Sequence, residues 1–197
     1  MESYIIVNYT LMDRRIFLQI PVLAFASTMI TKAQGLDPDK PRKGFKVNAG
    51  TDRYREELHI MGGQFNCMIS SNDSNGELLA YDTVRFEKGG PALHVHHSQD
   101  EWFYIIKGEF IAQVGEDKFS LKAGDSAFAP RKIPHAFAKV SEGEAQMLVL
   151  FQPAGSMEDF FKQMSKIGTS IPKDQEQVLK ELWRTHGMEL VGPPLSF

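Results

Sequence analysis

The sequence has little of several features that would narrow its class. It contains one cysteine, Cys67, so no disulfide can form within the chain. Because Cys67 alternates with Phe65 and Ile69, it is predicted to be a buried core thiol rather than a reactive one. No run of lysines and arginines stands out and the formal net charge is −3, so we expect no nucleic-acid partner. Hydrophobic residues make up 42% and charged residues 24% of the 197 residues, which indicates an ordinary soluble globular protein of one domain with appendages.

A long membrane-spanning run is also missing. The apolar stretch from Ile20 to Ile30 is shorter than the roughly 20 residues that a helical span needs, and Pro21 interrupts it. It follows the charged segment R-R-I-F-L at residues 14–18 and precedes a small-residue boundary at Ala33, the order of regions in a signal peptide. We therefore predict a signal peptide over residues 1–33, with an uncleaved membrane anchor as the alternative.

The segment at residues 14–18 resembles the twin-arginine export signal, with Asp13 in place of the usual hydroxyl residue and Gln19 in place of the usual lysine. The resemblance implies the twin-arginine export machinery as a partner and a periplasmic or extracellular location. Such peptides usually begin where Met12 stands, so residues 1–11 are interpreted as an extension from a misplaced start. Because that route moves folded proteins, it lets a metal be loaded in the cytoplasm, away from competing zinc and copper.

Residues 90–108 contain the densest group of candidate functional residues in the chain. Three candidate metal ligands, His94, His96 and Glu101, fall within eight residues, and a fourth, His135, follows in a segment punctuated by glycine and proline. Side chains at i and i+2 share a strand face, so His94 and His96 point the same way and His97 points the other way. Imidazole and carboxylate together suit one divalent transition metal, Fe, Mn, Ni, Cu or Zn.

Each of these residues also has a structural interpretation when it is taken alone. An isolated H-x-H pair is more often two exposed loop histidines than a metal site, and Glu101 alone is more often a solvated strand residue. The joint spacing favours the metal site. Four ligands from two hairpins leave one or two metal positions open for water or substrate, as in a catalytic site.

The same residues carry a resemblance to the cupin family. The first cupin motif is matched by His94, His96, Glu101 and Gly108, with its leading glycine off register at residue 89 or 90. The second motif is matched by Gly124, Pro130 and His135, whereas Lys132 replaces a usual glycine and Lys139 a usual asparagine.

The resemblance covers roughly residues 78–153. It implies an all-β fold, a small double-stranded β-helix or jelly-roll barrel with the metal inside. Among cupins, the chain is most similar to the single-domain, quercetin-dioxygenase-like type. The departures at Lys132 and Lys139 bear on the geometry of a turn rather than on the metal ligands.

The rest of the pattern agrees with a barrel of short strands. Strands are predicted at residues 58–60, 64–70, 78–87, 101–106, 109–114, 118–121 and 145–151. We predict a linker and N-terminal arm at residues 34–57, the cupin barrel at 58–155 and a helical extension at 156–197. Helices are expected after Ser156 and from Asp174. They are predicted to pack over the barrel or against a second subunit in a homodimer, with a lid over the metal as the alternative.

Four apolar residues near the ligand positions, Phe103, Ile105, Phe128 and Phe137, are candidates for a substrate pocket, although packing inside a small barrel explains them equally well. The resemblance implies a metal-dependent oxidoreductase, a dioxygenase acting on a small planar oxygenated organic substrate, with Glu101 as a catalytic base. The alternatives are a metal-dependent isomerase or lyase of a sugar or oxo-acid, or a non-enzymatic module that binds a small ligand, because cupins host many functions.

Overall fold

A computed structural model of the chain describes residues 43–167 and 176–197. The predicted signal peptide at residues 1–33 and the predicted helix start at Asp174 lie outside these residues. In chain order the elements are β1 (Leu58–Ile60), β2 (Gly63–Ile69), β3 (Leu79–Arg85), β4 (Ala92–His96), β5 (Asp100–Lys107), β6 (Glu109–Val114), β7 (Asp117–Lys122), β8 (Ser126–Ala129), β9 (His135–Lys139), β10 (Ala145–Gln152), α1 (Met157–Ile167), α2 (Glu176–Thr185) and β11 (Met188–Pro194).

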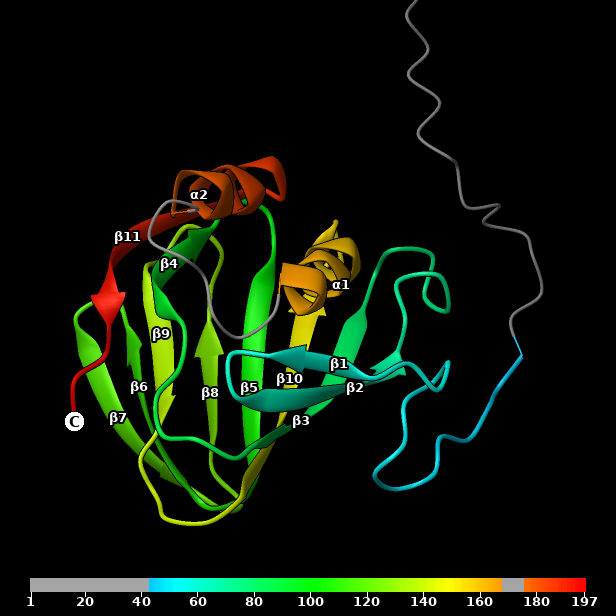
Figure 1. The fold of residues 1–197 in the computed structure, drawn as a ribbon, viewed down its shortest axis with the longest axis horizontal. Helices are drawn as coiled ribbons and strands as arrows, with labels where there is room; N and C mark the ends of the chain where they lie inside the picture. The colour runs from blue at the N-terminus through cyan, green and yellow to red at the C-terminus, as the bar shows by residue number, and fades with distance from the viewer. Residues whose placement is uncertain (1–42, 168–175) are drawn as a thin grey trace, which may run out of the picture. The chain divides into compact units, whose positions relative to one another are not determined.

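The strands form two antiparallel sheets, in the orders β1-β2-β3-β10-β5-β8 and β11-β4-β9-β6-β7. Strands distant in sequence are neighbours in both sheets, as β10 is between β3 and β5. Figure 1 shows the two sheets enclosing a common interior. This is a jelly-roll barrel, and the predicted all-β fold with C-terminal helices is confirmed.

The barrel interior is filled by alternate residues of each strand. On β10, for example, the buried residues are Ala145, Met147, Val149 and Phe151, with more exposed residues between them. Cys67 is 3% exposed and belongs to the same core, as its alternation with apolar neighbours predicted. Apolar burial of this kind is the main favourable contribution to folding.

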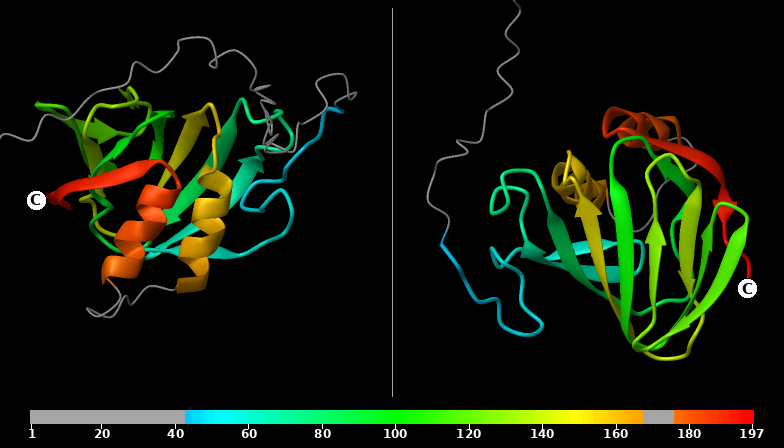
Figure 2. Two further views of the ribbon diagram at one scale, coloured as in Figure 1. Left: turned by 90° about the horizontal axis from the view of Figure 1, so that it is seen from above. Right: turned by 180° about the vertical axis from the view of Figure 1, so that it is seen from behind.

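The two helices lie side by side over one end of the strands (Figures 1 and 2). The rings of Phe160 on α1 and Trp183 on α2 contact each other with centroids 5.1 Å apart.

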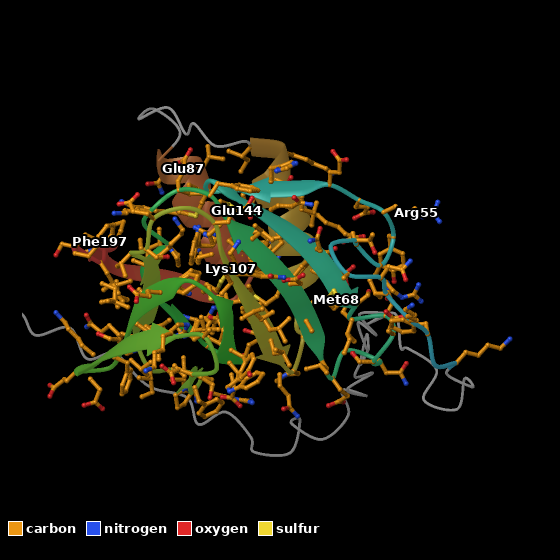
Figure 3. The ribbon with its side chains drawn as sticks, turned by 90° about the horizontal axis from the view of Figure 1, so that it is seen from below. Arg55, Met68, Glu87, Lys107, Glu144 and Phe197 are labelled. Atoms are coloured by element: carbon orange, nitrogen blue, oxygen red, sulfur yellow. The ribbon has the colours of Figure 1, made fainter. Side chains whose placement is uncertain are left out.

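Away from the helices, at the end of β5, Lys107 lies near Glu144 on the surface, with 3.4 Å between the ammonium and the carboxylate (Figure 3). In the described part of the chain, no helix is long and apolar enough to cross a membrane.

The end of the chain differs from the predicted helical extension. β11 is a strand that pairs with β4, with Met188 opposite His96 and Leu190 opposite His94. The prediction missed it because Pro193 and Pro194 lack backbone N–H groups, which argues against a strand inside a sheet. β11 is an edge strand, where such residues are tolerated.

Candidate metal centre

The candidate metal centre lies where the two sheets face each other. His94 and His96 are on β4, and His135 is the first residue of β9, directly opposite His94 in the strand pairing. Glu101 comes from β5 in the other sheet. The structure therefore brings the four predicted ligands together, and all four are buried, with exposed fractions between 0% and 4%.

Two local features fix the position of these strands. Lys132, at the position where the second motif usually has glycine, adopts a left-handed conformation with φ of 67°, so the turn keeps the shape that glycine normally provides. The Lys132 N–H donates to the carbonyl of His96 at 2.7 Å and ties this turn to β4. Gly90 lies so close to β9 that a Cβ atom there would be 1.8 Å from the carbonyl oxygen of Phe137, which only glycine permits.

One carboxylate oxygen stands at the centre of the cluster. Glu101 Oε2 is 2.8 Å from His135 Nε2, 3.3 Å from His96 Nε2 and 3.9 Å from His94 Nε2. One ligand atom from each of the four residues falls within 4.8 Å of all the others. The donor atoms thus converge on one point.

The outer nitrogens of two histidines are held by the backbone. His94 Nδ1 is 2.8 Å from the carbonyl oxygen of Ala92, and His135 Nδ1 is 2.9 Å from that of Ile133. Because a carbonyl only accepts, we assign the hydrogen to Nδ1 in both rings. His94 then presents an unprotonated Nε2 to the cluster, the orientation that metal-binding histidines need.

Burial and the neighbouring charges set the protonation of the site. Burial and the nearby His135 together lower the pKa of His94 to about 3, so His94 is neutral. Burial alone would raise the pKa of Glu101, but the hydrogen bonds from His135 and His96 outweigh it and the pKa is lowered. Burial likewise opposes the charged form of His135, but the hydrogen bond to Glu101 raises its pKa.

These observations fit a divalent transition metal. The site offers three imidazole nitrogens and one carboxylate oxygen, the donor set such metals prefer, at a buried point. His135 Nε2 and the Glu101 carboxylate oxygen are 2.8 Å apart, so both donor atoms face the same point. The Nδ1 of His96 has no hydrogen-bond partner among the described residues, whereas its Nε2 faces the Glu101 carboxylate.

A cavity adjoins the ligands His94, His96 and Glu101. It encloses about 50 Å³, room for a few waters, and its walls are mostly aromatic and apolar. Both helices contribute, because Phe160 of α1 and Trp183 of α2 line it, and the Trp183 ring is 5.0 Å from the His94 ring. Four methionines line it as well (Met61, Met157, Met164 and Met188), and methionine side chains adapt readily to a ligand.

The structure divides the predicted pocket residues. Phe137 lines the cavity, whereas Phe103 and Ile105 are buried in the core next to it and do not line it. Phe128 is 56% exposed on the outer face of β8, so its predicted place in the pocket is corrected. Strand alternation explains this, because Ala127 and Ala129 take the inward positions on β8.

One histidine was predicted to lie outside the site, and two residues of the cavity wall were not predicted. His97 faces outward with a 51% exposed side chain, as its place in the strand predicted. Trp183 and Arg85 line the cavity but were not predicted to do so. Trp183 lies on α2, in the region where a helix was expected from Asp174. Arg85 alternates with the buried residues Tyr81 and Thr83 along β3, a signal that places it on the inner face.

Comparison with known families agrees with this geometry. Residues 82–151 match the family described as the cupin domain. These residues form a cupin domain. The matched residues include all four candidate ligands, three on β4 and β5 and the fourth on β9. The cupin domain thus holds the whole candidate metal centre.

Relatives are similar to the cupin domain and its surroundings. The chain is 31% identical over 67 residues to an uncharacterized protein of Methanocaldococcus jannaschii, a match over 34% of this chain and 54% of that protein. The chain therefore spans about half the length of the curated relative it matches. Among solved structures, an RmlC-like cupin from Shewanella frigidimarina is 26% identical, with a TM-score of 0.47 over 60% of this chain and 96% of that one. Ectoine synthase from P. lautus is 14% identical, with a TM-score of 0.49 over 78% of this chain and 94% of that one.

Proposed function

We propose that the cupin domain is a metal-dependent oxidoreductase, a dioxygenase acting on a small planar oxygenated organic substrate. The observation that supports it most is the convergence of His94, His96, Glu101 and His135 within 4.8 Å beside an apolar cavity. Aromatic walls favour a planar apolar substrate body, and a metal held by these four residues would favour an oxygen-donor group on it.

The residues of the chain and the metal divide the chemistry between them. When bound, the metal would supply a Lewis acid for an oxygen donor of the substrate and, if it is redox-active, a route for electrons. Glu101 lines the cavity beside the histidines, so its carboxylate is the group placed to accept the proton of an enol or flavonol hydroxyl. The hydrogen bonds that Nδ1 of His94 and of His135 donate to the carbonyls of Ala92 and Ile133 keep both rings oriented toward the centre.

The helices have a role in excluding water from this chemistry. Phe160 and Trp183 cover the cavity beside His94, so an ionised substrate there is shielded from solvent. Exclusion of water strengthens every electrostatic interaction in the site and suppresses side reactions of an activated substrate. This covering favours the lid alternative for the helices.

Metal content and oxygen uptake together test the proposal. We expect metal-dependent oxygen consumption with at least one member of a flavonol and β-diketone panel, lost on chelation and in His135→Ala. His96→Ala should lose most of its metal, and His97→Ala is the matched control that should keep both metal and activity because its ring faces outward. Full metal occupancy in both His96→Ala and His135→Ala would contradict the site.

Two other outcomes would redirect the assignment. Metal-loaded protein that consumes no oxygen but isomerises or cleaves a sugar or oxo-acid would favour the isomerase or lyase. Protein that binds panel members without converting any of them would favour a binding module.

A further inference from the structure

We propose that Arg85 is a substrate-binding residue that takes a carboxylate group, so that the substrate of the proposed enzyme is an extended organic anion. One end of the molecule would present oxygen donors to the metal centre and the other a carboxylate to Arg85, with an apolar body between them. This inference rests on the proposed function for the metal end alone.

Arg85 and the candidate ligand Glu101 line the same cavity but come from different ends of one sheet. On β10, Phe151 stands beside Glu101, whereas Ala145, at the other end of that strand, stands beside Arg85. Both Arg85 and Glu101 line the cavity, so it connects the two positions. The rings of Phe137, Phe151 and Phe161 line it as well and offer an apolar surface for the body of a ligand.

The guanidinium of Arg85 is buried without a counter-ion. The side chain is 2% exposed, and within the described residues it forms no ion pair. Its Nη2 donates to the carbonyl of Met61 at 3.1 Å, but its Nε has no hydrogen-bond partner in this part of the chain. The nearby acidic residue, Glu87, is exposed (Figure 3). Burial lowers the pKa of Arg85 to about 10, so it remains a cation near neutral pH.

Burial of a charge without a counter-ion lowers the stability of the fold, so a purely structural role does not explain it. A buried charge normally has a partner that satisfies it, and an unsatisfied one destabilises the fold. The rings of Phe65 and Phe137 lie 5.9 and 5.6 Å from the Arg85 guanidinium carbon, and cation–π contact offsets only part of that cost. The planar guanidinium matches a carboxylate in geometry as well as charge, and a singly charged carboxylate suits the mostly apolar cavity, so we assign it as the missing partner.

The neighbouring strands leave space for this side chain. Arg85 is flanked by Gly63 on β2 and Ala145 on β10, two of the smallest residues. A Cβ atom at Gly63 would be 2.9 Å from Cδ of Arg85, so a larger residue there would push the arginine aside. Gly63→Ala is therefore a second way to displace the guanidinium without removing its charge.

A second buried cation shows what a structural role looks like here. Lys139 on β9 is 1% exposed, but its ammonium donates to the carbonyls of Ser141 at 2.9 Å and Phe86 at 3.3 Å. It does not line the cavity. Lys139→Met thus serves as the matched control for removal of a buried positive charge.

The test compares two probes that share a β-diketone. One is 4-(3-oxobutanoyl)benzoate, which adds a carboxylate, and the other is uncharged 1-phenylbutane-1,3-dione. Dissociation constants are measured by calorimetry on metal-loaded wild-type protein, Arg85→Met, Arg85→Lys, Gly63→Ala and Lys139→Met. We expect wild-type protein to prefer the carboxylate by about tenfold or more, the effect of one charge-assisted hydrogen bond.

The variants should separate the carboxylate from the metal. Arg85→Met and Gly63→Ala should lose the preference while metal content and binding of the uncharged diketone stay unchanged. Arg85→Lys should keep part of the preference, and Lys139→Met all of it. Equal affinities for the two probes in wild-type protein, or a preference that persists in Arg85→Met, would overturn the proposal.

A third probe distinguishes this failure from failure of the proposed function. 3-Phenylpropanoate has a carboxylate and a ring but no chelating diketone, and it is tested on metal-free protein. Binding that is lost in Arg85→Met supports the carboxylate site even if no metal chemistry is found. Absence of binding in the wild-type protein, with the diketones also failing to discriminate, would overturn the site.

Discussion

Replacing Glu158 should loosen the attachment of α1 to the barrel. Glu158 lies in the first turn of this helix and is 5% exposed. Its Oε2 accepts hydrogen bonds from the Ser70 hydroxyl at 2.8 Å, the Ser71 N–H at 2.9 Å and the Ser71 hydroxyl at 2.6 Å. Lys162 lies 3.2 Å from the other carboxylate oxygen. The helix is thereby tied to the turn between β2 and β3.

The size of the effect follows from these contacts. A hydrogen bond to a charged group contributes about 1.5–3 kcal/mol, but bonds that share one acceptor do not add. Without the Glu158 carboxylate, water can replace part of the hydrogen bonding of Ser71, which is half-buried. Ser70 is fully buried, so its hydroxyl would be left without an acceptor. We expect the free energy of unfolding to fall by about 2–4 kcal/mol in Glu158→Ala and by about 1–2 kcal/mol in Glu158→Gln, which keeps an acceptor oxygen.

The same contacts predict how the effect depends on pH. Burial on its own raises the pKa of Glu158, but the hydrogen bonds from Ser71 and Ser70 outweigh it and the pKa is lowered from the ordinary value of 4.5. A lowered pKa stabilises the fold above pH 4.5, and the contribution is lost as the pH falls through the lower value in the folded protein. The difference between wild-type and Glu158→Gln should therefore be constant from pH 6 to 7 and shrink below 4.5.

Urea denaturation followed by circular dichroism measures these differences. Glu181→Gln is the control, because Glu181 is an exposed carboxylate on α2 that pairs at 2.6 Å with Arg184, which is also exposed. Exposed pairs contribute little, so this variant should unfold like the wild-type protein. A Glu158→Gln variant as stable as Glu181→Gln at pH 7, or a difference that grows toward pH 3, would refute the reasoning.

Three further predictions concern the metal and the export signal. His135→Ala should lose its metal and unfold at a lower temperature than the metal-loaded wild type, whereas His97→Ala should match the wild type in both metal analysis and calorimetry. Glu101→Gln should lower turnover more than metal content in paired assays, since it keeps an oxygen donor but cannot accept a proton. Replacing Arg14 and Arg15 with lysine should retain the precursor in the cytoplasm, and unchanged export on fractionation would instead indicate the general secretory route.

The metal ligands could be predicted from the sequence because their placement is largely local. Alternation along one strand puts His94 and His96 on the same face, and a short connector leads to Glu101. That Glu101 belongs to the opposite sheet, with its carboxylate oxygen 2.8 Å from His135, depends on long-range strand pairing. The spacing pattern of the family supplied that information, and elementary periodicity did not.

The elements that were missed depended on contacts between distant segments. β11 contains proline, and it becomes a strand only because the edge of β4 is available to it. The inward position on β8 could not be assigned from composition, because Phe128 is the larger apolar residue and the alanines beside it are the buried ones. The register with β5 determines which residues of β8 face inward, and it places the alanines there although Phe128 is more hydrophobic.

The hydrogen-bond partners of two buried cations in this barrel distinguish a structural role from a functional one. Lys139 on β9 and Arg85 on β3 are equally buried cations. Lys139 finds two carbonyls at the positions its ammonium needs, so its burial is explained by the fold alone. Arg85 keeps an unpartnered Nε on the wall of the metal cavity, so its burial is explained only by something that enters. Removal of Lys139 should therefore reduce stability, whereas removal of Arg85 should reduce the selectivity for anions.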